Sequence, residues 1–335
     1  MSPMTAPRTA SDAAGPAADA VASDTVASDT AALDAAVAPG PAMRLRGVRL
    51  GYGETEVVHG IDLDVPRHAT TVIIGANGCG KSTLLRGLTR QLPLRGGSIE
   101  VLGQDVGALS AKAYARTVAL LPQSPLVPDG MTVEQLVDRG RHPHRSWLGT
   151  RTREDDAVIA SALTRMDLVD LADRQVSQLS GGQRQRVWLA LVLAQQTPVI
   201  LLDEPTSYLD MSHQVELLEL VKGLPDPTVP GEGSAGGEAA AASDSASASD
   251  GAAHPTGPHR ATTVAVLHEL NMAARVADHV VAMAAGRIVA TGTPAEVLVP
   301  DVLAEVFDLA ADVITDPLLG HPVVLPRTAA EAARG

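Results

Sequence analysis

A glycine-rich loop between a short apolar segment and a helix-forming segment carries the first residues that could do chemistry. Residues 70–74 are TTVII, and residues 75–83 are GANGCGKST. In the spacing G-x-x-x-x-G-K-[ST], glycines let backbone N–H groups approach phosphate oxygens, and a helix N-terminus faces the same anion. We expect Lys81 to bind the β- and γ-phosphates and Ser82 to ligate Mg²⁺. The nucleotide contacts expected here are Gly75, Asn77, Gly78, Cys79, Gly80, Lys81, Ser82 and Thr83.

Cys79 is the single cysteine of the chain, so no intramolecular disulfide can form. Within the glycine loop it could be a small filler residue. It could also be a reactive thiol at a helix N-terminus. The second interpretation predicts that alkylation of Cys79 blocks nucleotide binding.

A second apolar segment ends in two adjacent acids. Residues 198–202 are PVILL, and Asp203, Glu204 and a proline follow. A strand that runs into two acids places both at the carboxyl end of a sheet, the edge where open α/β folds bind ligands. We expect Asp203 to hold Mg²⁺ and Glu204 to polarise the water that attacks the γ-phosphate. The alternative is a solvated acidic turn, which the phosphate loop in the same chain disfavours.

A serine–glycine turn precedes another helix-forming segment. Residues 179–186 are LSGGQRQR, and residues 187–194 continue as VWLALVLA. Ser180 is a good N-cap and the glycines leave backbone donors open, so the turn is either a capped core helix start or a second anion site. A head-to-tail dimer could use it by clamping each nucleotide between the lysine loop of one subunit and the turn of the other. The contacts expected from the turn are Ser180, Gly181, Gly182 and Gln183.

Together these motifs resemble those of the ATP-binding subunits of ABC transporters, over about residues 43–335 apart from an insertion. The resemblance implies that Tyr52 stacks on adenine, that Gln123 senses Mg²⁺ and the attacking water, and that His268 contacts the γ-phosphate. It also implies that residues 207–210 form the D-loop, with Asp210 at the nucleotide. Glu269 stands where the family usually has an aspartate, which keeps the charge. The resemblance thus implies the catalytic set Glu204, His268, Gln123 and Lys81, and the Mg²⁺ set Ser82, Gln123 and Asp203.

Four further stretches resemble one branch of that family, the ATPases of ferric-siderophore importers. They are residues 139–147, 206–214, 270–278 and 316–324. Importers of vitamin B12 and haem are relatives of this branch, so the cargo stays open between an iron–siderophore complex, cobalamin and haem. The resemblance implies a separate membrane permease, and residues 139–147 would lie in the helical region that meets it.

The motifs must be positioned by an α/β fold, a P-loop NTPase core with a mixed or parallel sheet. Strands near 44–50, 60–65 and 98–102 predict a small antiparallel β subdomain beside this core. Helical patterns at 132–139 and 153–169 predict an α-helical subdomain within about 125–180. In the helix after the D-loop, Val215, Leu218 and Val221 predict a packing stripe. The strand before His268, residues 263–267, is expected in the same sheet as the strand that ends at Asp203.

Two low-complexity segments carry much of the net charge of −13. Residues 1–42 and 224–261 are rich in Ala, Ser, Pro, Gly and Asp, and each has five acids and one arginine. We interpret residues 1–42 as a disordered tail and 224–261 as a surface insertion, with an interdomain linker as the alternative for the second. Because residues 224–261 fall between two strands of one expected sheet, residues 43–335 are predicted to form a single domain.

The composition excludes several classes of protein. The acidic net charge and the 2% aromatic content disfavour nucleic-acid binding. No apolar run approaches the ~20 residues of a membrane span, and the N-terminus lacks the pattern of a secretory signal. We therefore expect a peripheral protein at the cytoplasmic face of the cell membrane.

The function predicted from the sequence is ATP hydrolysis with ATP and Mg²⁺, which energises import through a separate permease. The expected partners are a second ATPase subunit, the permease and, indirectly, an extracytoplasmic substrate-binding protein, and no nucleic acid is expected. The alternative from a different class is a soluble ABC ATPase that acts on ribosomes or DNA. The single phosphate loop, the lack of a heptad repeat and the acidic charge disfavour it.

Overall fold

The computed structural model describes residues 40–123, 125, 130–146, 149–207, 209–224, 226–227, 260–328 and 331. The chain divides into Met1–Ala38 and Pro39–Gly335, and every described residue belongs to the second unit. The predicted tail at 1–42 therefore lies almost wholly outside the described residues. The same holds for residues 228–259, which make up most of the predicted insertion.

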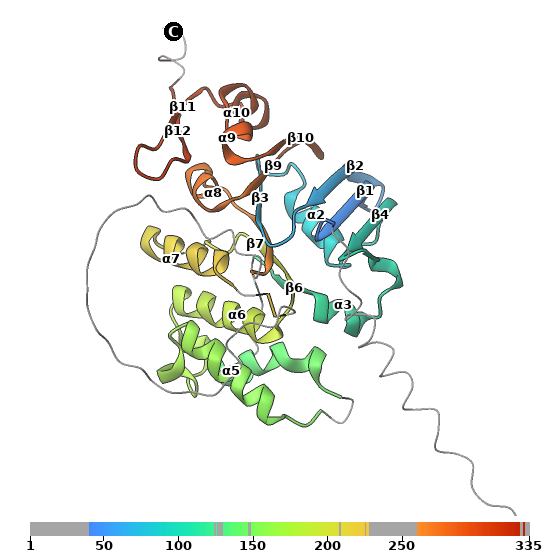
Figure 1. Ribbon diagram of the computed structural model, residues 1–335, viewed down its shortest axis with the longest axis vertical. Coiled ribbons are helices and arrows are strands. Elements are labelled where there is room, and N and C mark those ends of the chain that lie inside the picture. The colour runs from blue at the N-terminus through green and yellow to red at the C-terminus, as the bar shows by residue number, and fades with distance from the viewer. Residues whose placement is uncertain are drawn as a thin grey trace, which may run out of the picture. The chain divides into compact units, whose positions relative to one another are not determined.

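A six-stranded mixed sheet forms the centre of the unit (Figure 1). Five neighbouring strands are parallel, and the edge strand β10 runs antiparallel to β9. In spatial order the strands are β10 (Arg287–Gly292), β9 (His279–Ala284), β3 (Thr70–Gly75), β8 (Thr262–Val266), β7 (Val199–Asp203) and β6 (Val118–Leu121). The expected α/β fold class is confirmed, and the strand before His268 pairs directly with the strand that ends at Asp203.

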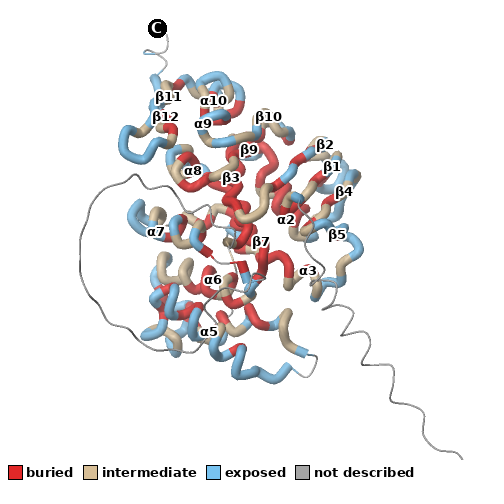
Figure 2. The backbone as a smooth tube through the Cα atoms, viewed as in Figure 1, coloured by how far each residue is buried: buried red, intermediate tan, exposed pale blue. Residues whose placement is uncertain are grey.

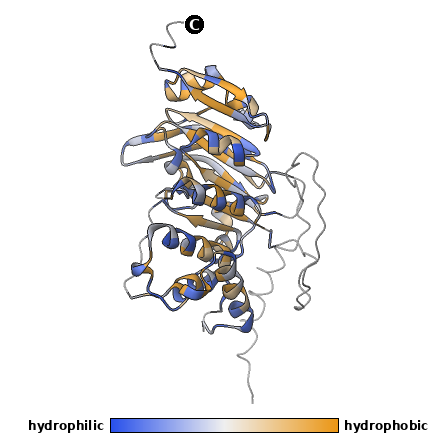
Figure 3. Cartoon of the chain, turned by 90° about the vertical axis from the view of Figure 1, so that its left-hand side faces the viewer, coloured by the Kyte–Doolittle hydropathy of each residue, from blue (hydrophilic) through white to orange (hydrophobic). Residues whose placement is uncertain are grey.

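The central sheet separates two hydrophobic cores. Along β3, Val72 and Ile74 pack in one core and Ile73 in the other, because side chains alternate across a strand. All six residues of β3 are buried, as is typical of a parallel strand covered on both faces. The central strands are accordingly among the most buried and most apolar parts of the chain (Figures 2 and 3).

Helices that follow the central strands supply the first core. Residues from each of them pack against one face of the sheet. These helices are α4 (Val133–Asp138), α5 (Arg153–Arg165), α6 (Gly181–Gln195), α7 (Met211–Lys222), α8 (Leu270–Val276), α9 (Pro294–Val297) and α10 (Pro300–Phe307). On α7 the buried residues are Leu217, Leu218 and Val221, while Val215 of the predicted stripe is half-buried.

The second core lies between the central sheet and a four-stranded antiparallel sheet, with α2 (Lys81–Leu88) and α3 (Ala111–Thr117) contributing to it. The small sheet has the spatial order β2–β1–β4–β5. Its strands are β1 (Met43–Tyr52), β2 (Thr55–Val65), β4 (Gly96–Val101) and β5 (Gln104–Asp105). These strands confirm the three that the sequence predicts for the small β sheet, with shifts of at most five residues at their ends.

The regular structure described between β6 and α6 is helical apart from an isolated bridge between Thr132 and Gln175. Short 3₁₀ turns connect the helices, and α5 ends at Arg165 rather than near 169 because Asp167 takes a left-handed conformation (φ 53°). The turns around α4 and α5 are η2 (Arg139–His144), η3 (Val169–Leu171) and η4 (Val176–Gln178), and η1 (Val106–Ala108) precedes α3. A hairpin of β11 (Ala311–Thr315) and β12 (Pro322–Pro326) follows α10. Among the described residues no helix is both long and apolar enough to cross a membrane.

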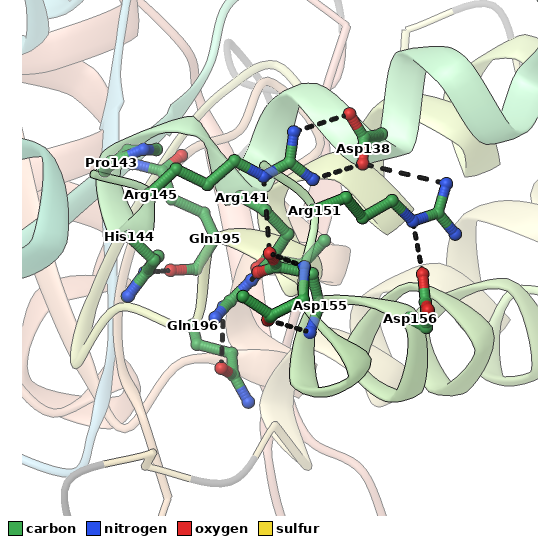
Figure 4. A network of polar contacts seen from close by, with 12 residues as sticks. Asp138, Arg141, Pro143, His144, Arg145, Arg151, Asp155, Asp156, Gln195 and Gln196 are labelled. Carbon is green, nitrogen blue, oxygen red and sulfur yellow. Dashed lines mark hydrogen bonds and ion pairs between the residues drawn. The ribbon is translucent and has the colours of Figure 1, made fainter. Parts of the chain in front are cut away.

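A buried ion pair fixes η2 against α5 and α6 (Figure 4). Arg141 Nε donates to Asp155 Oδ1 at 2.8 Å, and its Nη1 donates to the carbonyl of Ala194 at 3.0 Å and to Gln196 Oε1 at 2.7 Å. Arg145 Nε lies 3.3 Å from the other oxygen of Asp155. Both side chains of the Arg141–Asp155 pair are at most 4% exposed, so this pair ties three segments together away from water.

Candidate nucleotide site

The glycine loop connects the end of β3 to the start of α2, as its spacing predicts. Gly80 is the N-cap of α2 and takes a left-handed conformation (φ 109°) that L-residues with a side chain rarely adopt. The loop therefore turns sharply and points the N-terminus of α2 toward its own hollow. Cys79 in this loop is 6% exposed, and that burial favours its interpretation as a packing residue.

Lys81 reaches back over the loop instead of into solvent. Its Nζ donates to the carbonyls of Gly75 at 2.7 Å and Ala76 at 3.1 Å, and the residue is 5% exposed. Carbonyl oxygens thus hold a buried ammonium group beside the helix N-terminus. This arrangement places two sources of positive potential at one point, which suits a phosphate group.

Ser82 and Asp203 meet where the loop approaches the end of β7. Ser82 Oγ donates to Asp203 Oδ1 at 3.1 Å. Asp203 is 8% exposed, and burial raises the pKa of its carboxyl although the Ser82 hydrogen bond opposes that rise. A hydroxyl and a carboxylate are hard oxygen ligands of the kind that Mg²⁺ takes from a protein when nucleotide phosphates and water complete its shell. The donor chemistry of this pair therefore fits Mg²⁺.

Residues that follow three neighbouring strands contact one another at Glu204, at the carboxyl ends of these strands. Gln123 Nε2, after β6, donates to Glu204 Oε2 at 2.6 Å, and Ser207 Oγ donates to the same oxygen at 3.3 Å. His268 Nε2, after β8, contacts Oε1 of the carboxylate. Glu204 itself has a positive φ of 52°, a strained backbone conformation for a residue with a side chain. The fold thus brings three of the predicted site residues together with Ser207.

A hollow joins the glycine loop to the Glu204 cluster. Its lining contains predicted residues from the loop together with Glu204 and His268, and it also includes Val57 of β2. The carboxylate and the lysine loop therefore face one shared space in which a phosphate and a water molecule could meet. The loop residues in the lining are Asn77, Gly78, Gly80, Lys81, Ser82 and Thr83.

The serine–glycine turn and Asp210 lie outside the lining of that hollow. Ser180 caps α6 with a capping box, in which its hydroxyl accepts from the Gln183 N–H at 3.2 Å and the Gln183 side chain accepts from the Ser180 N–H at 3.1 Å. Asp210 caps α7 and accepts from the His213 N–H at 3.1 Å. Ser180, Gly181 and Asp210 are exposed, so these three residues face outward from the same chain.

Tyr52 lies at the end of β1, outside the lining of the hollow. The residue is 43% exposed, and Arg86 Nη1 donates to its hydroxyl at 3.1 Å. Three contributors were not predicted as site residues, namely Ser207, Val57 and Arg86. The sequence offered a signal for Ser207 alone, because it is the first residue of the predicted D-loop.

Comparisons with known proteins agree with this geometry. A family model described as ABC transporter matches residues 58–207. The "Probable siderophore transport system ATP-binding protein YusV" of Bacillus subtilis is 42% identical over 85% of this chain and 92% of its own length. The ferric enterobactin transport ATP-binding protein FepC of Escherichia coli is 39% identical over 87% of this chain and 97% of its own. ATP-binding proteins for import of cobalamin, from Halobacterium salinarum, and of hemin, from Streptomyces coelicolor, also match.

Solved structures show the same fold. A metal-chelate type ABC transporter in an inward-facing conformation superposes with a TM-score of 0.65 at 23% identity, over 86% of this chain and 98% of that one. A match at this identity supports the fold. The alignments with the two sequence relatives above cover nearly the whole length of those proteins, and they support the family. The chain therefore belongs to the family of ATP-binding subunits of ABC transporters, which hydrolyse ATP to drive transport.

Proposed function

We propose that this chain hydrolyses ATP at the hollow between the glycine loop and Glu204. The observation that carries the proposal is the Glu204 carboxylate, which accepts hydrogen bonds from Gln123 and Ser207 beside the lysine loop. A carboxylate held in this way can accept a proton from the attacking water as the bond to the γ-phosphate forms. His268, on the other oxygen, would hold the carboxylate in place and contact the γ-phosphate.

The remaining loop residues would bind and orient the triphosphate. Backbone N–H groups of residues 75–83 and the Lys81 ammonium would neutralise its β- and γ-oxygens. Ser82 and Asp203 would hold Mg²⁺, with Gln123 near it, and the ion would supply charge neutralisation between the phosphates. Cys79 would line the loop, and Tyr52 would stack on the base.

The second half of each site would come from another copy of the chain. Ser180, Gly181 and Asp210 face outward and do not line the hollow, so a nucleotide bound there would be completed by these residues of a partner. Gly182 and Gln183 belong to the same turn. ATP would draw the two copies together head to tail, and product release would separate them, which gives a permease a motion to follow.

The proposed cargo is an iron–siderophore complex, carried through a separate membrane permease that receives it from an extracytoplasmic binding protein. Two relatives named for siderophore or ferric enterobactin transport, similar over nearly their whole lengths, support this cargo. Relatives named for cobalamin and for hemin import keep those cargoes as the second candidate. The chain would act at the cytoplasmic face of the membrane.

Glu204→Gln tests the catalytic assignment. The amide cannot take up the proton, so we expect turnover to fall by about 10²-fold or more while ATP binding persists. Steady-state hydrolysis and ATP binding by calorimetry measure the two quantities. Glu269→Gln is the matched control, because Glu269 is exposed and its side chain does not cap α8. Normal turnover by Glu204→Gln would disprove the assignment of the base.

Growth of a deletion strain tests the cargo. Restored growth on a ferric siderophore by the wild-type chain, but not by Glu204→Gln, would support the iron assignment. Restoration only on cobalamin or haem would replace it with the second candidate. Copurification with ribosomes or DNA instead of a membrane permease would contradict the role in transport.

A further inference from the structure

Arg86 connects the glycine-loop helix to the exposed ring of Tyr52. Helix α2 begins at Lys81, and Arg86 lies in its last turn. Its Nη1 donates to the Tyr52 hydroxyl at 3.1 Å. Tyr52 is the last residue of β1, and both side chains are exposed. An exposed ring next to a turn would otherwise be free to change rotamer, so this hydrogen bond restricts where the ring lies.

The packing of α2 on β1 sets the distance that this hydrogen bond spans. A Cβ at Gly87, the residue after Arg86, would lie 2.4 Å from Leu50 Cδ1, so the Leu50 side chain would have to shift to make room for it. Leu50 is fully buried and precedes Tyr52 by two residues on the same strand. Helix α2 and strand β1 are therefore in direct contact one residue away from Arg86. This contact fixes the backbone from which the guanidinium reaches the Tyr52 hydroxyl.

We propose that Arg86 is a positioning residue for the nucleotide base. It holds the Tyr52 ring at a fixed place relative to Lys81, because the guanidinium and the lysine belong to one short helix. The base platform and the phosphate loop then form one preorganised unit, and ATP need not immobilise the ring when it binds. This inference rests on the proposed function in one respect, the stacking of the base on Tyr52.

A different role for Arg86 has to be separated from this one. A cation in the last turn of a helix interacts favourably with the helix dipole, whatever its side chain touches. Arg90 offers the comparison, since it lies close after the end of α2 and does not bind Tyr52. Its Nη1 donates to the Leu109 carbonyl at 2.8 Å, and its guanidinium lies 5.6 Å from the ring centre of Tyr114.

A double-mutant cycle on Arg86 and Tyr52 tests the proposal. Tyr52→Phe keeps the ring and removes the hydroxyl, and Arg86→Gln removes the guanidinium. We expect each to raise the KM and Kd for ATP by about two- to tenfold with kcat unchanged, because the lost hydrogen bond acts on binding. The double variant should bind ATP no more weakly than whichever single variant binds it more weakly, since both substitutions remove the same hydrogen bond. Arg86→Lys should recover part of the loss, and Arg90→Gln should match the wild type.

Each contrary outcome has a definite meaning. Additive effects in the double variant, a fall in kcat with Arg86→Gln, or equal effects of Arg86→Gln and Arg90→Gln would overturn the role of Arg86. Tyr52→Ala separates the inference from the assignment beneath it. If Tyr52→Ala binds ATP as the wild type does, the stacking assignment fails. If Tyr52→Ala weakens binding while Tyr52→Phe and Arg86→Gln do not, only the inference about Arg86 fails.

Discussion

At the scale of single residues, Asp203 shows a conflict between its proposed role as a Mg²⁺ ligand and the stability of the fold. Burial raises the pKa of its carboxyl, so the folded chain binds a proton there more readily than the unfolded chain does. An acid with a raised pKa costs stability once the pH exceeds that pKa, and the cost disappears as the pH falls and the carboxyl is protonated. The proposed role gives a reason for this cost, since an ionised oxygen of Asp203 would ligate Mg²⁺.

We therefore predict that Asp203→Asn is more stable but inactive. Asparagine keeps an oxygen that can accept from Ser82 and removes the buried charge. Without nucleotide, its Tm at neutral pH should exceed that of the wild type by about 1–3 °C. The difference should shrink in acid, where the wild-type carboxyl is protonated. Thermal unfolding followed by circular dichroism measures it, and a lower Tm at neutral pH would show that the charge is compensated in the fold.

At this scale, the candidate site residues that a local sequence pattern can indicate are those that directly follow a strand. The loop around Lys81 and the acid pair after β7 each combine a strand with polar residues at its end, and sheet geometry then brings them together. Val57 and Arg86 escaped prediction because their contacts cross between elements that only tertiary packing brings together. No local pattern marks such a contact.

At the scale of elements, the region between β6 and α6 combines apolar helix packing with a charged network. The sequence predicts α4 and α5 from their apolar spacing, but not η2, which contains a proline and six residues of 3₁₀ structure. Arg141 of η2 pairs with Asp155 near the start of α5 (Figure 4). Burial acts to raise the pKa of Asp155, but hydrogen bonds from Arg141, Thr152 and Arg145 outweigh it and lower that pKa.

We predict that Asp155→Asn lowers the free energy of unfolding by about 3–5 kcal/mol, because it leaves the Arg141 charge buried and unpaired. Asp156→Asn is the matched control, since Asp156 pairs with Arg151 at the surface and should cost about 1 kcal/mol or less. Urea unfolding measures both. Because the pKa of Asp155 is lowered in the fold, the wild type should lose this stabilisation as the pH falls below about 4. If Asp155→Asn loses stability just as steeply in acid, the loss comes from other carboxyl groups.

At the scale of the whole molecule, the proposed nucleotide-binding residues of the chain form two separate groups. Lys81 and Glu204 line one hollow, while Ser180 and Asp210 cap the exposed starts of α6 and α7. A symmetric pair of chains is a simple arrangement that brings the first group of one copy to the second group of the other. Each dimer would then contain two identical composite sites related by a two-fold axis.

Mixing two inactive variants tests this arrangement directly. We expect Lys81→Ala and Ser180→Arg each to abolish hydrolysis alone, because every site in either homodimer carries a defect. A mixed dimer would join both defects in one site and leave the other site intact. Equal amounts mixed before assembly should regain about a quarter of wild-type hydrolysis, since half of the dimers are mixed and each has one intact site of two. The double variant Lys81→Ala/Ser180→Arg mixed in equal amounts with the wild type is the control, since each of its mixed dimers carries one defect in each site. This mixture should keep about a quarter of wild-type hydrolysis, all of it from wild-type homodimers, instead of the half expected if each chain contained a complete site. No recovery in the first mixture, despite mixed dimers detected by differential tagging, would place the complete site within one chain.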